Sequence, residues 1–124
     1  MNKTRPVNLD LGTIALPVTA KASILHRISG VFLVAAVAAL LYALDLSLSG
    51  EDGFARVSAL LGSPLARLAL WAVLAGLIYH AVAGVKHLLM DLGVGETLEG
   101  GITGARVTFV VAGILIVAAG VWVW

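Results

Sequence analysis

Three long apolar runs dominate the sequence, and few polar side chains interrupt them. They cover about residues 28–48, 65–85 and 107–124. The hydrocarbon core of a bilayer is about 30 Å thick and is crossed by a helix of roughly 20 apolar residues, so each run predicts a membrane-spanning helix. Asp45 and Arg67 lie near the ends of two runs, where their charges can reach water. The pattern therefore predicts an all-α membrane protein with three transmembrane helices.

Lysine and arginine are unevenly divided between the two sides of these helices. If the N-terminus is cytoplasmic, that side carries Lys3, Arg5, Lys21, Arg27, Lys86 and Arg106, and the other side carries only Arg56 and Arg67. The same orientation brings Tyr42, Trp71, Trp122 and Trp124 to the outer ends of their helices. Positive charge accumulates on the cytoplasmic side of membrane proteins, and aromatic side chains anchor helix ends in the interface. Both patterns predict a cytoplasmic N-terminus.

The remaining segments are short. In the first connection Phe54, Val57 and Leu61 recur at helical spacing, which predicts a short helix on the outer membrane surface. The second connection, residues 91–104, is rich in glycine and predicts a flexible cytoplasmic loop. Residues 1–22 contain prolines and show little periodicity, so we expect an extended cytoplasmic arm. The whole chain then forms a single transmembrane domain.

Composition agrees with a membrane protein and excludes several functions. The 124 residues are 60% hydrophobic and 12% charged, with a mean hydropathy of +1.05, whereas soluble domains are about 45–50% apolar. A chain without cysteine cannot hold an iron–sulfur cluster, a covalently attached c-type haem or a disulfide. No G-x-G-x-x-G motif supports flavin or nicotinamide binding, and the dispersed basic residues do not indicate nucleic-acid binding. Redox chemistry would need centres on other chains.

His80 is the first candidate for chemistry, because it lies inside an apolar run and five residues separate it from Lys86. A histidine at that depth needs a partner, which is either a neighbouring helix or a metal such as haem iron. Gly76, Gly84 and His87 share its helical face, and glycines above and below would leave room for a flat macrocycle. Glycines also allow close helix packing, so both interpretations stay open. His87 lies roughly 10 Å further along, at the interface, where it could face a haem propionate.

The stretch SILHRISG, residues 23–30, brings polar side chains to the start of the first apolar run. Ser23 and Arg27 are four residues apart and share one face of any helix that begins before Ser23. A hydroxyl and a guanidinium at the membrane edge could donate to the carbonyl oxygens of a quinone, which gain negative charge on reduction. In the alternative, Ser23 caps a helix and Arg27 anchors among lipid headgroups.

Two patterns of residues resemble signatures of the cytochrome b556 subunits of succinate dehydrogenase. The first is Arg5-Pro6-Val7, Leu11 and Ser23-x-x-His26-Arg27-x-Ser29, and the second is His80-x-x-x-Gly84-Val85-Lys86-His87-Leu88-x-Met90-Asp91-x-Gly93. With the chain length and the three-helix layout, they cover almost the whole chain. Lys86 stands where this family usually has arginine, which keeps the charge but loses the planar fork of donors.

The resemblance implies a role for each matching residue. His80 would be an axial ligand of a haem b that is shared with a second membrane anchor subunit. Ser23 and Arg27 would belong to the ubiquinone site, and His26 with Arg27 would lie near the haem propionates, beside His87. The resemblance also implies a flavoprotein subunit that oxidises succinate and an iron–sulfur subunit that passes electrons to quinone. This chain would then be a non-catalytic electron-transfer subunit of complex II.

Two other functions are compatible with the residues. One is a haem-free membrane anchor or assembly subunit. The other is a small transporter or proton channel that uses His80 as a titrating group, although three short helices offer few polar groups for a pathway. No targeting segment precedes Arg5 and Pro6, so we expect a multi-pass protein of the bacterial inner membrane.

Overall fold

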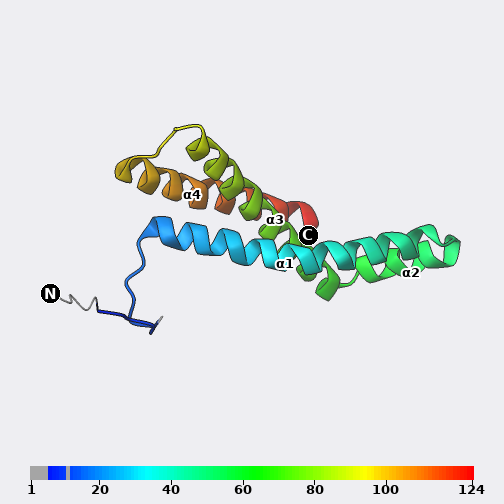
Figure 1. The fold of residues 1–124 in the computed structure, drawn as a ribbon. Coiled ribbons are helices and arrows are strands. Elements are labelled where there is room, and N and C mark those ends of the chain that lie inside the picture. Colours follow the sequence, from blue (N-terminus) through cyan, green and yellow to red (C-terminus); the bar gives the residue numbers. More distant parts are fainter. Residues whose placement is uncertain (1–5, 11) are drawn as a thin grey trace.

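The computed structural model describes residues 6–10 and 12–124, which form four helices and no strand. The helices are α1 (Val18–Leu48), α2 (Glu51–Leu61), α3 (Pro64–Asp91) and α4 (Leu98–Val123). α3 and α4 form an antiparallel pair, and α3 also contacts α1 (Figure 1). α1, α3 and α4 are long and apolar enough to cross a membrane. The prediction of an all-α protein with three membrane-spanning helices is confirmed.

α1 begins well before the apolar run that predicted it. Its first residue is Val18, directly after Pro17, so the predicted arm of residues 1–22 ends at residue 17 instead. The helix has 31 residues, which at 1.5 Å per residue makes it about 46 Å long, against roughly 30 Å for the hydrocarbon core. Hydropathy detects the part of a helix that lies in the membrane core, whereas backbone hydrogen bonding decides where the helix begins. The polar positions of SILHRISG are therefore helical.

The loop between α3 and α4 is shorter than predicted. It covers residues 92–97 rather than 91–104, because Thr97 caps α4. The Thr97 hydroxyl accepts a hydrogen bond from the backbone N–H of Gly100 at 3.0 Å, and Glu99 adds negative charge to the first turn. These two features outweigh the low helix propensity of the glycines that follow.

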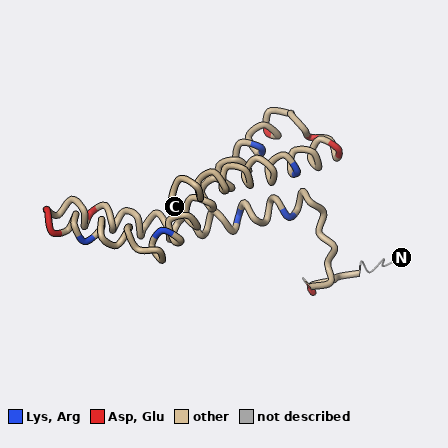
Figure 2. Tube along the Cα trace, turned by 180° about the vertical axis from the view of Figure 1, so that it is seen from behind, with Lys and Arg blue, Asp and Glu red and all other residues tan. Residues whose placement is uncertain are grey.

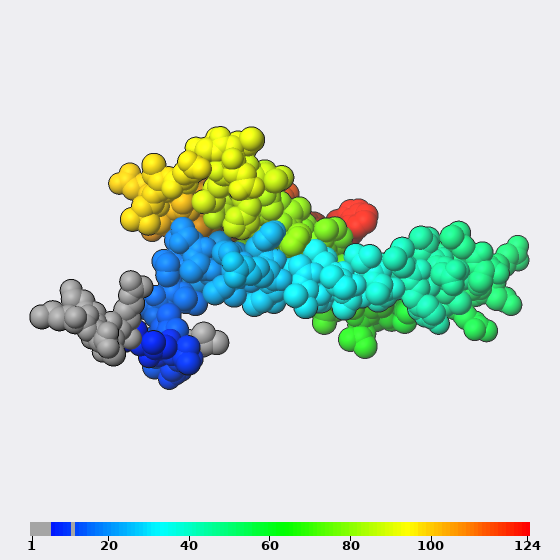
Figure 3. Space-filling model, in the orientation of Figure 1, coloured from blue at the N-terminus to red at the C-terminus, as the bar shows by residue number. Residues whose placement is uncertain are grey.

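The first connection contains the predicted short helix, α2, which turns back along the end of α1. The two form a hairpin that projects beyond the start of α3 (Figures 1 and 3). Gly50, at the turn, has a φ of +144°, a conformation that side chains with a Cβ rarely adopt. Gly53 is buried, and a Cβ there would collide with the carbonyl oxygen of Leu46. The position of α2 on the outer membrane surface stays a prediction.

The long helices pack through small side chains. The buried residues of α1, α3 and α4 are Ala22, Ser29, Ala36, Ala83, Gly101, Ala105, Thr108 and Ala112. Among the described residues no large side chain is fully buried, and many large apolar side chains point outward. Small residues allow membrane helices to approach closely, while lipid or another protein covers the apolar exterior.

Two aromatic side chains bind across the helices. The indole N–H of Trp71 donates to the carbonyl oxygen of Ile116 at 2.9 Å, which joins α3 to α4. The hydroxyl of Tyr79 donates to the carbonyl oxygen of Ala22 at 2.7 Å, which joins α3 to α1. Cross-helix hydrogen bonds in membrane bundles contribute about 0.6 kcal/mol each, so these bonds select the register of the helices more than they hold them together.

Lysine and arginine side chains gather at one end of the bundle, where acidic residues in and beside the loop between α3 and α4 also lie (Figure 2). The start of α1, the end of α3 and the start of α4 lie at that end, and all three segments carry lysine or arginine (Figure 2). The cations in these segments are Lys21, Arg27, Lys86 and Arg106. The fold thus brings together the described residues that the positive-inside pattern assigns to the cytoplasm. Lys3 and Arg5, which the same pattern assigns there, lie outside the described residues.

Candidate functional site

All three histidines of the chain meet where α1 crosses α3. The rings of His26 and His80 are stacked, with centroids 4.2 Å apart and an interplanar angle of 12°. The His87 ring lies 5.0 Å from that of His26, tilted by 51°. All three side chains are half-buried. We refer to His26, His80 and His87 as the histidine cluster.

The nitrogen Nδ1 of His80 is held by two oxygen atoms of α1. The Ser29 hydroxyl donates to the carbonyl oxygen of His26 at 2.7 Å. Nδ1 of His80 lies 3.0 Å from that hydroxyl oxygen and 3.2 Å from the same carbonyl oxygen. A carbonyl oxygen only accepts, and the serine hydrogen already binds it, so Nδ1 must carry the proton and donate. Neutral His80 therefore has its lone pair on Nε2.

Nε2 of His80 is the atom through which this chain could bind a metal. Nε2 has no hydrogen-bond partner among the described residues. Every buried side-chain nitrogen of these residues has a partner, so Nε2 is not buried and reaches the surface of the chain. Metal-bound histidines usually donate their other ring N–H to a carbonyl or a similar acceptor, as His80 does. The donor chemistry of His80 thus fits an axial ligand of haem iron.

The histidine cluster does not form a complete metal site. In residues 6–10 and 12–124, no three histidine, cysteine, aspartate or glutamate side chains are arranged to hold one metal ion. His26 and His80 present parallel ring faces to each other rather than nitrogens to a common point. A six-coordinate iron bound by His80 would take its second protein ligand from another chain.

The glycines on the His80 face of α3 are occupied by side chains of α1. A Cβ on Gly76 would lie 2.8 Å from a phenylalanine ring, and a Cβ on Gly84 would lie 3.6 Å from Nε2 of His26. The expectation that glycine leaves room for a flat macrocycle is therefore wrong at Gly76, which close helix packing accounts for, whereas a Cβ at Gly84 would make an ordinary van der Waals contact. Gly30 of α1 was not expected to matter, but a Cβ there would lie 3.1 Å from Cε1 of His80. Its small size lets α1 approach the imidazole.

Ser23 and Arg27 lie one turn apart on α1, as the spacing predicts, because the helix begins before both. The N-cap of α1 is Pro17, so Ser23 does not cap the helix. Ser29 and Ser47 donate to the carbonyl oxygen three residues earlier, whereas the Ser23 hydroxyl makes no hydrogen bond to any described residue. The half-buried Ser23 hydroxyl is therefore available to a ligand.

Arg27 borders a shallow hollow of about 430 Å³ on the surface of α1. Its other walls are Ile28, Val31 and Phe32, and only apolar atoms line the hollow, so Arg27 contributes its aliphatic stem. All four residues come from a single helix, which leaves one side open to lipid or to another protein. A flat apolar ring suits this shape.

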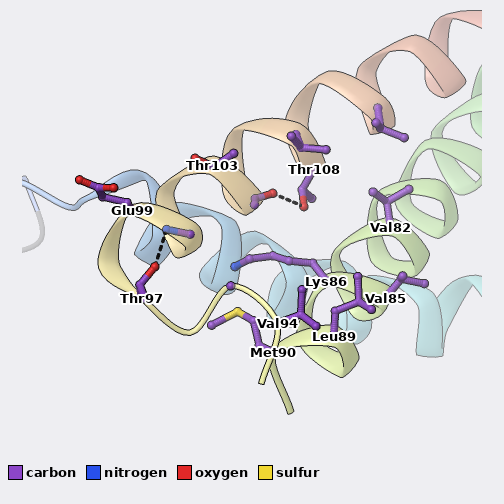
Figure 4. A pocket seen from close by; sticks show the side chains of 15 residues that line it. Val82, Val85, Lys86, Leu89, Met90, Val94, Thr97, Glu99, Thr103 and Thr108 are labelled. Atoms are coloured by element: carbon purple, nitrogen blue, oxygen red, sulfur yellow. Dashed lines mark hydrogen bonds between the residues drawn. The ribbon is translucent and has the colours of Figure 1, made fainter. Parts of the chain in front are cut away.

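A larger hollow, of about 690 Å³, lies between the end of α3 and the start of α4 (Figure 4). Its lining is mostly apolar, and Lys86 extends into it with its aliphatic stem against Gly104. The hollow shares no lining residue with the histidine cluster or with the hollow at Arg27. Its size alone therefore does not make this hollow the functional site.

Ser29 is the site residue that sequence reasoning missed. It belongs to the first family-like pattern, but its contact with His80 joins positions 51 residues apart. A serine three residues after His26 signals a hydrogen bond within the helix, which the structure contains. The sequence does not reveal which neighbouring helix meets that hydroxyl.

These features define a class of protein: a multi-pass helical membrane protein with a histidine cluster near the end of its bundle that carries Lys21, Arg27, Lys86 and Arg106. Comparison with known families narrows this class. The family model for the succinate dehydrogenase/fumarate reductase transmembrane subunit matches residues 1–121, and the chain belongs to that family.

Two bacterial relatives agree with the family. The chain is 41% identical over 125 residues to the succinate dehydrogenase cytochrome b556 subunit of Coxiella burnetii (strain RSA 493 / Nine Mile phase I), with 100% of both chains covered. It is 33% identical over 95 residues to the protein of the same name from Paracoccus denitrificans, which covers 77% of this chain and 73% of the relative. The family recognised from the two residue patterns is confirmed.

Proposed function

We propose that this chain is the membrane anchor of a succinate dehydrogenase that binds haem b and ubiquinone in the bacterial inner membrane. The observation that carries the proposal is the state of His80, whose Nδ1 is committed to two acceptors of α1 while Nε2 is accessible. The relatives' names, which contain both a b-type cytochrome and succinate dehydrogenase, support it.

In this proposal His80 would hold the haem iron through Nε2, together with a residue of a second membrane anchor subunit. Haem b, once bound, adds a centre that accepts and releases one electron. His26 and His87 lie beside His80, and these two side chains, with Arg27 at the next position of α1, would hold the propionates. The stacked His26 ring also restricts rotation of the His80 ring.

Ser23 and Arg27 form this chain's part of the quinone site in the proposal. Both can donate to a quinone oxygen, and both stabilise the negative charge that this oxygen gains on reduction. The apolar hollow beside Arg27 receives the ring from the lipid side. Succinate oxidation and the transfer of electrons toward quinone belong to a flavoprotein subunit and an iron–sulfur subunit, since this chain has no cysteine.

An oxidised-minus-reduced absorption spectrum of the purified membrane complex tests the proposal. We expect the bands of a low-spin b-type haem, because an imidazole is a strong axial ligand. A complex that assembles without haem would contradict the proposal and support the haem-free anchor. Proton or solute transport by the reconstituted, haem-free chain would support the transporter.

We expect Lys86→Arg to change haem content and quinone turnover very little. The Lys86 stem lies against Gly104 in the larger hollow, with room for a longer side chain, and either residue keeps the charge. Haem per flavin and succinate–quinone activity of the variant complex provide the measurement. A large change in either quantity would show that the ammonium group has a specific partner.

A further inference from the structure

We propose that Ser29 is a positioning residue for His80: its hydroxyl oxygen accepts a second hydrogen bond from Nδ1–H and raises the basicity of Nε2 toward iron. The inference rests on the proposed haem function. It assigns a role to a residue for which neither the family resemblance nor the matched relatives supply one.

Ser29 is placed to do this by three contacts. It is only 8% exposed, on the side of α1 that faces α3. Its hydroxyl donates to the His26 carbonyl oxygen at 2.7 Å, which turns a lone pair of Oγ toward Nδ1 of His80 at 3.0 Å. Gly30, the next residue, has no side chain to keep the imidazole away. Serine at 29 and glycine at 30 thus act together on one ring.

The hydrogen bond changes the properties of His80 as a ligand. When Nδ1–H donates to an acceptor, electron density on Nε2 increases, and the imidazole becomes a stronger ligand. A stronger, more basic ligand favours oxidised over reduced iron and lowers the midpoint potential. Without the Ser29 hydroxyl, Nδ1 keeps only the His26 carbonyl oxygen at the longer distance of 3.2 Å. The carbonyl oxygen still requires the proton on Nδ1, but the imidazole has one acceptor fewer, so Nε2 is less basic.

Three variants of the assembled complex separate this role from simple packing. Ser29→Ala removes the hydroxyl, and Ser29→Thr retains it on a side chain that also binds the preceding turn of a helix. Ser47→Ala is the matched control, because Ser47 is in the same helix and donates to the Leu44 carbonyl oxygen at 2.8 Å, yet has no histidine partner. The readouts are the haem midpoint potential from an optical redox titration and the ratio of haem to flavin.

We expect Ser29→Ala to retain haem and to raise its midpoint potential. A tenfold loss of preference for the oxidised state corresponds to about 59 mV for one electron, which we take as the upper bound. Ser29→Thr should return the potential to the wild-type value, and Ser47→Ala should leave it unchanged. If Ser29→Ala instead loses haem, retention of haem in Ser29→Thr supports the same role. An unchanged potential in Ser29→Ala, or an equal shift in Ser47→Ala, would overturn the inference.

A second measurement does not require haem. Nitrogen-15 NMR of the full chain with labelled histidine, in detergent, reports which ring nitrogen of His80 carries the proton. We expect Nδ1–H in both proteins, with the Nδ1 resonance shifted in Ser29→Ala because one acceptor is lost, whereas identical spectra would overturn the role of Ser29. A wild-type complex without haem would refute the proposed function instead, so the two failures are distinguishable.

Discussion

Replacement of His80 by leucine is expected to remove most of the low-spin haem from the complex while the chain stays in the membrane. Leucine has no lone pair for iron, so the one axial ligand that we assign to this chain is lost. The apolar part of α3 that is long enough to cross a membrane is retained, so membrane insertion should be unaffected. The reduced-minus-oxidised spectrum, normalised to flavin, gives the haem content. A spectrum equal to that of wild type would contradict the assignment.

The structure also predicts where residual haem in His80→Leu would come from. The His26 ring is stacked 4.2 Å from that of His80 and is the nearest replacement ligand. The double variant His80→Leu with His26→Leu should therefore contain less haem than either single variant. Leu77→Ala is the control, because Leu77 is 49% exposed, lies one turn before His80 and contributes nothing to the histidine cluster.

Arg27→Leu and Ser23→Ala are each expected to lower quinone reduction by on the order of 10²-fold, the usual effect of removing one donor to an oxygen that becomes charged during the reaction. Electron transfer from succinate to a water-soluble dye that accepts electrons upstream should persist, because the flavin and the clusters belong to other chains. The measurement is the ratio of quinone activity to dye activity in membranes with equal enzyme content.

Other roles of these two residues predict different results. If Arg27 only anchors the chain among lipid headgroups, both activities should fall together as assembly fails, or neither should change. Lys21→Leu is the control for charge, because Lys21 is an exposed cation of the same helix outside the hollow at Arg27. A ratio equal to that of wild type in both Ser23→Ala and Arg27→Leu would remove these residues from the quinone site.

Much of the fold was predictable because the membrane imposes a strong pattern. Apolar runs located the three long helices, and the spacing of Phe54, Val57 and Leu61 located α2. The ends of the helices were not predictable in this way. The cap at Thr97 and the early start of α1 depend on backbone hydrogen bonds, which hydropathy does not register.

The site was predictable only within each helix. Helical periodicity was enough to put Ser23 and Arg27 on one face of α1. The stacking of His26 on His80 depends on which face of α1 meets α3, and that choice is made by contacts between distant segments. The prediction that Gly76 leaves room for a macrocycle was wrong for the same reason. The phenylalanine ring that fills this space comes from another helix.

The small-residue interior of this chain has a thermodynamic consequence. With only alanine, glycine, serine and threonine buried in its long helices, and with apolar side chains covering much of its exterior, the isolated fold has little cohesion of its own. Any species that binds the folded form alone adds stability by mass action, about 2.7 kcal/mol when its concentration is 100 times its dissociation constant. The free energy of unfolding of this chain therefore depends on its surroundings, and it changes with the concentration of the species that cover its helices.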